Sequence, residues 1–446
     1  MKEDVNRYHP AKALGLTFIT LIVAGGFLLA LPISTNSHLT VIDIFFTSAS
    51  AVCVTGLTTV DVSTTYTFFG KLIILLLIQV GGLGMMTFTA VMLWLLRQRI
   101  SLSDRMTLQY SLVQDDMEFS LRSFIFFIIK YTFVFEAIGA FCFFFALDVN
   151  GGIWNRIFFS LFHSVSAFCN AGFSLYSDNF VRYSDSIFIN VVTMSLIFLG
   201  GIGFIVVFEF KHIIKRIFVK KGVKYCTNIF SLHSWTVINF SIILIISGMI
   251  LIYGLEHLSH TSDMTLLEAL FQSVTCRTAG FNTVNVGLLD NSTLLIMTLL
   301  MFIGGSPGST AGGIKTTTFA VLIFVAFLSR NNFEEVTAKN RTIPKTVIYQ
   351  AFLVFLFSCL VVFSATVILA AVEKNITFIS LFFECVSAFG TVGLSTGVTE
   401  YLSTTSKIVL ILVMFFGRVG SIAIFSIFLN RVPMHVKNAE ERILVG

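Results

Sequence analysis

The chain has 446 residues, of which 56% are hydrophobic and 12% are charged. Soluble domains carry about twice that charged fraction, so the composition excludes an ordinary soluble domain and indicates an integral membrane protein. The net charge of +5 needs no nucleic-acid partner, because the basic residues gather in loops between apolar runs. The seven cysteines have neither disulfide nor metal-ligand spacing.

Apolar runs long enough to cross the membrane, which takes roughly 20 residues, occur eight times. They lie at about 13–33, 70–96, 123–147, 186–208, 235–255, 292–328, 346–372 and 406–430. A shorter apolar segment, at about 40–52, 154–168, 265–275 and 376–388, lies inside each pair of runs. These segments are too short to cross, so we predict pore helices that enter the membrane and stop.

The predicted fold is an all-α integral membrane protein with four tandem span, pore helix, span (M1-P-M2) units in a pseudo-fourfold arrangement around one central pore. The units cover residues 13–97, 123–210, 234–329 (with a broken second span) and 346–430, and a cytoplasmic tail covers 431–446. One supersecondary unit used four times in one polypeptide can build such a pore without a tetramer.

A short motif ending in glycine follows each predicted pore helix. The glycines Gly56, Gly172, Gly280 and Gly393 are 116, 108 and 113 residues apart. Glycine permits backbone angles that direct successive carbonyl groups toward one axis, where they replace the hydration shell of a cation. The alternative is that these glycines only allow close helix packing. The predicted filter consists of Val54, Thr55, Gly56, Asn170, Ala171, Gly172, Thr278, Ala279, Gly280, Thr391, Val392 and Gly393, with potassium at the carbonyls of the non-glycine members.

A second glycine cluster lies 24 to 28 residues after each motif glycine, midway along the second span of its unit. Small residues there would widen the cavity or let the helix bend. In the third unit the cluster extends from Gly304 to Lys315 and must break the helix inside the membrane, whereas the other spans are expected to be unbroken. Irregular backbone at that depth lines a wet cavity or is buried in protein, so we predict a gate, with a surface linker as the alternative. The predicted gate comprises Gly304, Gly305, Ser306, Pro307, Gly308, Ser309, Thr310, Ala311, Gly312, Gly313, Lys315 and Arg418.

Arg418 is a fixed positive charge in the middle of the last span, which is costly in a membrane. Facing the pore, it would repel a permeating cation below the filter. The alternative is a structural contact with a carbonyl or with a carboxylate such as Glu136. Arg277, inside the third motif, is expected to point away from the pore and brace its loop.

Orientation follows from the positions of Lys and Arg. The two ends and the loops after the second, fourth and sixth runs hold 20 of the 29, and six lie between the runs of a pair. We therefore expect both termini in the cytoplasm and the motifs on the extracellular half, where acidic residues such as Asp178 and Glu400 raise the local cation concentration.

Four such units, each with one filter glycine, resemble the Trk/Ktr/HKT superfamily of potassium transporters over essentially the whole chain. The segments Cys53 to Leu57 and Thr391 to Ser395 are similar to its filter signatures, residues 303–317 to its intramembrane gating loop, and Arg418 to the arginine of its last span. Because the chain starts directly with the first unit, it is most similar to the KtrB-type membrane subunits of bacterial Ktr systems.

The resemblance implies potassium uptake across the bacterial cell membrane by a homodimer on a cytoplasmic ring of nucleotide-binding RCK subunits of the KtrA type. It also implies potassium as the permeant ion and sodium as an activator. No Walker motif is present, so we expect no nucleotide on this chain itself and no enzymatic activity. The main alternative is a sodium-selective or sodium-coupled relative; a secondary transporter with inverted halves and a membrane enzyme fit the pattern less well.

Overall fold

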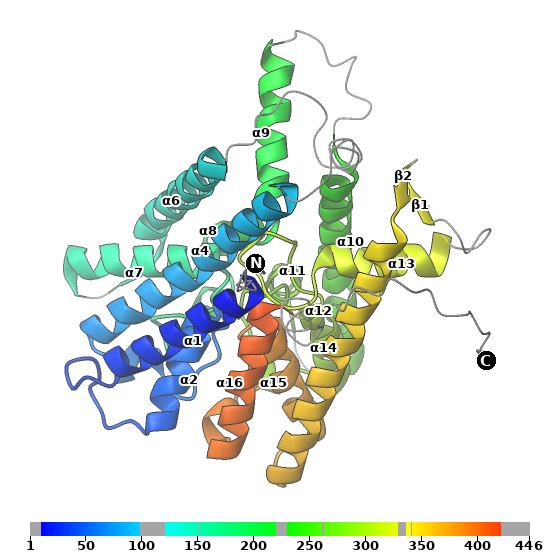
Figure 1. Cartoon of the computed structure of the whole chain (residues 1–446). Helices are drawn as coiled ribbons and strands as arrows, with labels where there is room; N and C mark the ends of the chain where they lie inside the picture. Colours follow the sequence, from blue (N-terminus) through cyan, green and yellow to red (C-terminus); the bar gives the residue numbers. More distant parts are fainter. Residues whose placement is uncertain are drawn as a thin grey trace, which may run out of the picture.

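The computed structural model describes residues 10–98, 121–149, 151–219, 230–260, 263–328, 336–339 and 341–420. It is predominantly helical (Figure 1). The expected tail 431–446, and the part of the last span beyond residue 420, lie outside the described residues. The helices that overlap the eight predicted apolar runs are α1 (Pro10–Leu29), α4 (Phe68–Gln98), α6 (Leu121–Ala146), α8 (Ile187–Gly201), α9 (Phe204–Val219), α10 (Leu232–Ser259), α12 (Asn291–Phe302), α13 (Thr316–Leu328), α14 (Lys345–Val372) and α16 (Thr404–Val419).

Four further helices, of 10 to 17 residues, lie where the sequence predicts pore helices: α2 (Val41–Val52), α7 (Gly152–Phe168), α11 (Leu266–Thr275) and α15 (Phe378–Gly390). A threonine starts three of them, because its hydroxyl accepts a hydrogen bond from an amide of the first turn. α7 starts instead at Gly151, which has φ 103°. The remaining elements are a single turn, α3 (Val62–Thr65), the 3-10 helices η1 (Val181–Tyr183), η3 (Val286–Leu288) and η4 (Thr399–Tyr401), and the antiparallel strands β1 (Val336–Ala338) and β2 (Arg341–Ile343). The hairpin of β1 and β2 is a small departure from the all-α prediction.

By length and composition, three helices among the described residues can each cross a membrane: Ser123–Ala146, Leu232–Ser259 and Lys345–Val372. The pair formed by α8 and α9 provides a fourth crossing if its two members are one span. The remaining apolar helical stretches are 10–17 residues long, and they include Leu14–Leu29 of α1, Phe68–Gly84 of α4 and the two halves of the interrupted sixth run, α12 and α13.

The expectation that only the sixth run is broken is wrong. Between α8 and α9 the chain bends by 94°, at Ile202 and Gly203, and Figure 1 shows α9 projecting beyond α8. Gly203 has φ 93°, and a Cβ there would lie 2.7 Å from the Pro307 carbonyl oxygen, so only glycine suits this corner. In the first unit, by contrast, Gly81 to Gly84 stay inside the helix α4.

One contact between a long helix and the following short helix recurs three times. A serine of the short helix donates to a carbonyl of the long one: Ser48 to Ile22 (2.7 Å), Ser164 to Glu136 (2.6 Å) and Ser273 to Ile245 (2.7 Å). Opposite each serine lies a glycine, Gly25, Gly139 or Gly248, whose missing side chain makes room for the hydroxyl. The repeated sequence pattern is therefore matched by repeated packing.

The first and last parts of the chain are neighbours. Figure 1 shows α16 beside α1 and α2, and α16 contacts both of these helices. At this contact the Lys407 ammonium is 2.8 Å from a carboxylate oxygen of Asp43, with both side chains mostly buried. Removing one partner of such a pair leaves an unpaired buried charge, so the pair holds the two ends of the chain together.

Candidate functional site

The segments after the four short helices share an unusual backbone. Two residues before each motif glycine, a residue with a side chain has a left-handed conformation: Val54 (φ 56°), Asn170 (59°), Thr278 (74°) and Thr391 (50°). The glycines also have positive φ, of 95°, 69°, 77° and 91°. Valine and threonine rarely adopt this conformation, and it persists only where surrounding contacts enforce it. Strain at equivalent positions of four loops indicates a shared function.

The four glycines form a closed ring. A Cβ on any one of them would collide with a neighbouring glycine loop. At Gly56 it would meet Gly172, at Gly172 it would meet Gly280, at Gly280 it would meet Gly393 and Gly172, and at Gly393 it would meet Gly56. The ring order is thus Gly56, Gly172, Gly280, Gly393, the order in the sequence.

Six residues before the motif glycine, three of the four loops have a serine whose side chain hydrogen-bonds to the backbone of the loop. The Oγ atoms of Ser50 and Ser387 accept hydrogen bonds from the amides of Gly56 (3.0 Å) and Gly393 (3.1 Å). Ser166 acts in a different way, because its Oγ donates to the Phe173 carbonyl at 2.8 Å. The third motif has Val274 at this place and lacks the contact, so its loop departs from the others.

Two hydroxyl groups at the ring make no hydrogen bond within the described part of the chain. They are Thr55 Oγ1 and Thr391 Oγ1, and both residues are fully buried. A buried hydroxyl without a partner costs about 1–3 kcal/mol. A ligand such as a dehydrated cation would supply that partner.

The second glycine cluster has a role that the sequence did not indicate. Gly81, Gly200 and Gly417 each lie against the carbonyl four residues before a motif glycine, on Val52, Phe168 and Phe389 respectively, and a Cβ would overlap with it. These glycines let α4, α8 and α16 pack directly on the ends of α2, α7 and α15, respectively. In the third unit, Gly304 instead lies against the Gly312 carbonyl of the predicted gate loop.

Replacing Gly417 with alanine is therefore expected to destabilise the fold, because overpacking a buried contact costs about 1–3 kcal/mol. Gly254→Ala is the matched control, since Gly254 is also helical and a Cβ there would meet no atom of the described residues within 4 Å. The measurement is the thermal unfolding midpoint of the purified protein in detergent. Equal midpoints for the two variants would contradict this assignment.

The predicted gate loop and the corner between α8 and α9 satisfy each other's backbone groups. The bend frees the carbonyls of Gly200 and Gly201, which accept from the amides of Thr310 (3.3 Å) and Ser306 (3.1 Å). In return, the Phe204 amide donates to the Gly308 carbonyl at 3.0 Å. The break in the second unit and the loop of the third are one hydrogen-bonded structure, which explains how irregular backbone is tolerated there.

Hydroxyl groups and a lysine add contacts inside the loop. The hydroxyls of Ser306 and Thr316 are 3.0 Å apart, and Ser309 Oγ donates to the Ser306 carbonyl at 2.6 Å. Lys315 Nζ donates to the Ala311 carbonyl at 2.6 Å. The loop is therefore folded on itself and almost fully buried.

Arg418 reaches the loop from α16 and is 1% exposed. Its guanidinium donates to the carbonyl of Thr310 in the loop, and to that of Gly81 in α4 at 2.9 Å. Glu136, the carboxylate considered as its partner, instead accepts from Gln79 at 3.3 Å. Arg277 donates to the Ser241 carbonyl on α10 at 3.5 Å, as a bracing residue would. Arg418 thus connects the loop to the first and fourth units.

Four short helices that end at a ring of glycine loops, next to a buried polar loop, are typical of a membrane cation transporter. The family model of TrkH, described as a cation transport protein, matches residues 5–438. The chain belongs to this family, as the sequence motifs indicate.

Individual relatives support the assignment. The chain is 36% identical to Ktr system potassium uptake protein B of Bacillus subtilis (99% of this chain, 97% of that protein). It is 35% identical to potassium/sodium uptake protein NtpJ of Enterococcus hirae (100% and 99%). The solved structure of the potassium transporter TrkH from Vibrio parahaemolyticus matches with a TM-score of 0.74 and 20% identity, covering 96% of this chain and 86% of that one, which shows a common fold. The chain is thus a membrane transporter of the potassium-transporting Trk/Ktr family, similar to KtrB.

Proposed function

We propose that this chain is the ion-translocating subunit of a Ktr-type system that takes up potassium across the bacterial cell membrane. The single observation that carries the proposal is the closed ring of four strained glycine loops, with unpartnered threonine hydroxyls beside it. Carbonyl rings of this kind replace the hydration shell of a dehydrated cation. The names of the relatives agree with this function.

The architecture proposed for this function is the four-unit pore, with units 13–97, 123–210, 234–329 and 346–430 around one axis. The ring order of the glycines and the repeated serine contacts support it. Both termini are placed in the cytoplasm on the distribution of Lys and Arg.

Selectivity for potassium over sodium is proposed because all four ring positions are glycine. Sodium, as an activator or a second permeant ion, is the alternative, because one relative is named as a potassium/sodium uptake protein. Uptake of potassium, rubidium and sodium into proteoliposomes tests the proposal. Preferred potassium and rubidium uptake is the expected result, and uptake that favours sodium would support the alternative.

Below the filter, the loop from Gly304 to Lys315 and Arg418 are proposed to form the gate. The loop is buried and is connected to α8, α9 and α16, so its withdrawal requires several hydrogen bonds to break together. Such a loop rearrangement falls in the µs to s range, slow enough for a switch.

A homodimer on a cytoplasmic ring of RCK subunits is the proposed assembly. The support is the name of the relatives as proteins of a Ktr system and the short basic loops, which are too small to form a regulatory domain. Copurification from the native membrane should recover a soluble nucleotide-binding partner. If the isolated chain transports at full rate and ignores cytosolic protein and nucleotide, this part of the proposal fails.

A further inference from the structure

One position of the four proposed pore helices holds a different residue in each copy. In two copies its side chain bonds to the segment that follows the motif glycine. Nine residues before the motif glycine stand Thr47, His163, Phe271 and Glu384. Thr47 donates back to the Asp43 carbonyl of its own helix at 2.9 Å, and Phe271 has no polar group. His163 and Glu384 instead bind the segment that follows their glycine.

Glu384 is fully buried and accepts hydrogen bonds at both carboxylate oxygens. Oε1 accepts from Ser395 Oγ (2.7 Å) and from the Thr396 amide (2.9 Å) and hydroxyl (3.3 Å). Oε2 accepts from Thr399 Oγ1 at 2.7 Å. Four hydrogen bonds thus tie both carboxyl oxygens to the segment from Ser395 to Thr399.

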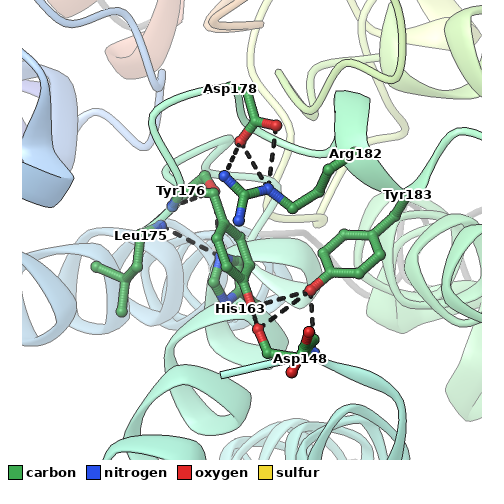
Figure 2. Close-up of polar contacts among 8 residues, drawn as sticks. Asp148, His163, Leu175, Tyr176, Asp178, Arg182 and Tyr183 are labelled. Atoms are coloured by element: carbon green, nitrogen blue, oxygen red, sulfur yellow. Dashed lines mark hydrogen bonds and ion pairs between the residues drawn. The ribbon is translucent and has the colours of Figure 1, made fainter. Parts of the chain in front are cut away.

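His163 performs the same task in the second loop with a neutral ring (Figure 2). Nε2 lies 3.2 Å from the Leu175 amide and must accept from it, so Nδ1 carries the proton and donates to the Phe159 carbonyl at 2.8 Å. The ring stacks on Tyr176, whose other side faces the Arg182 guanidinium 4.5 Å away. Arg182 is in turn paired with Asp178.

The two clamped loops lie on opposite sides of the ring. In the ring order, Gly172 and Gly393 each have Gly56 and Gly280 as neighbours, so they face each other across it. The loop held by Glu384 also contains Thr391, a β-branched residue at φ 50°. Strain of that kind persists only where nearby contacts fix the backbone, and Glu384 supplies such contacts.

We propose that Glu384 and His163 are positioning residues that hold two opposite filter loops in place and thereby set the discrimination between potassium and sodium. The inference rests on the proposed function. A smaller ion is stabilised only if the loops can close further around it, and anchoring the segments beyond the glycines opposes that movement. Glu384 carries the larger share, because it makes four hydrogen bonds to its segment and His163 makes two.

The test compares sodium and potassium uptake by the full chain in proteoliposomes. Glu384→Ala is expected to raise the sodium-to-potassium uptake ratio by at least about fivefold, the factor for losing one hydrogen bond of about 1 kcal/mol. Glu384→Gln keeps the volume and an acceptor oxygen, so it should restore part of the discrimination. His163→Leu should shift the ratio in the same direction by a smaller factor.

The matched control is Glu373→Ala. Glu373 also accepts two hydrogen bonds, from the Ser403 amide (2.8 Å) and from Ser406 Oγ (2.7 Å), but these lie at the start of α16, away from the ring. Its uptake ratio should equal that of the parent. An equal shift in Glu373→Ala and Glu384→Ala would overturn the inference, because general loosening would then explain both.

If Glu384→Ala does not fold, Thr399→Val decides, since it removes a single hydroxyl from Oε2. A rise in the ratio that is smaller than the one expected for Glu384→Ala is predicted, and an unchanged ratio would overturn the inference. Gly393→Ser distinguishes a failure of the positioning role from a failure of the filter assignment. If it alters the ratio while a folded Glu384→Ala does not, the filter stands and the positioning role fails; if neither alters it, the filter assignment itself fails.

Discussion

Replacing Gly393 with serine is expected to reduce potassium uptake by about tenfold or more and to raise sodium uptake relative to potassium. Gly393 has φ 91°, and a Cβ there would overlap with the Thr55 carbonyl oxygen of the neighbouring loop. The loop must move outward or rotate its carbonyls, and either change spoils the cage for a dehydrated cation. The measurement is the initial rate of potassium and sodium uptake into proteoliposomes.

Gly152→Ser is the matched control for this variant. Gly152 lies at the start of α7 and has φ 88°, but a Cβ there would meet no atom of the described residues within 4 Å. It introduces the same backbone strain without the collision, so its ion preference should equal that of the parent. Unchanged preference in well-folded serine variants of Gly56, Gly172, Gly280 and Gly393 would end the filter assignment.

Deleting Ser306 to Gly312 is expected to raise the basal potassium flux by about tenfold or more. The deletion removes the loop's backbone hydrogen bonds to Gly200, Gly201 and Phe204, each worth about 1 kcal/mol. It also removes the Thr310 carbonyl that Arg418 binds. Potassium should still be preferred over sodium, because the four ring glycines are untouched. The measurement is flux without any cytoplasmic regulator.

Arg418→Gln tests the same gate without shortening the chain. It weakens the contact between α16 and the loop, so it should raise basal flux in the same direction. Arg156→Gln is the control, because the Arg156 guanidinium also donates to a backbone carbonyl, that of Leu147 at 3.2 Å, but it lies near the start of α7; its basal flux should equal that of the parent. If the folded deletion conducts less than the parent under activating conditions, the loop is a support and not a gate.

Much of the backbone could be predicted because apolar length and glycine spacing are local signals. Helices occur close to all four predicted pore segments, for example α2 at Val41–Val52 against an expected 40–52. The interruption at Gly304 was equally visible, since no helix accommodates that many glycines with a proline. These features need no knowledge of neighbouring segments.

The corner at Gly203 could not be predicted in the same way. The clusters Gly81 to Gly84 and Gly200 to Gly203 look alike in the sequence, yet only the second one breaks its helix. The difference is tertiary, because the gate loop supplies partners for the carbonyls that the break exposes. A hydrogen-bond donor contributed from about a hundred residues further along the chain leaves no local pattern.

Individual side-chain partners were also beyond the sequence. Arg418 was recognised as costly in the membrane, but only the structure identifies the carbonyls of Thr310 and Gly81 as its acceptors. The sequence does not mark Glu384 and His163 as positioning residues, because their position holds a different residue type in each unit and so shows no repeated pattern. Aligning the four units on their glycines would have placed an acid and a histidine together at that position.

Anomalous scattering from rubidium or thallium, with the ion soaked into crystals of the protein, tests the central claim most directly. The account predicts peaks on the axis of the ring formed by Gly56, Gly172, Gly280 and Gly393, within coordination distance of the carbonyls just before these glycines. The same peaks should disappear in Gly393→Ser. Ordered ions bound elsewhere in the membrane region, with none at the ring, would contradict the account.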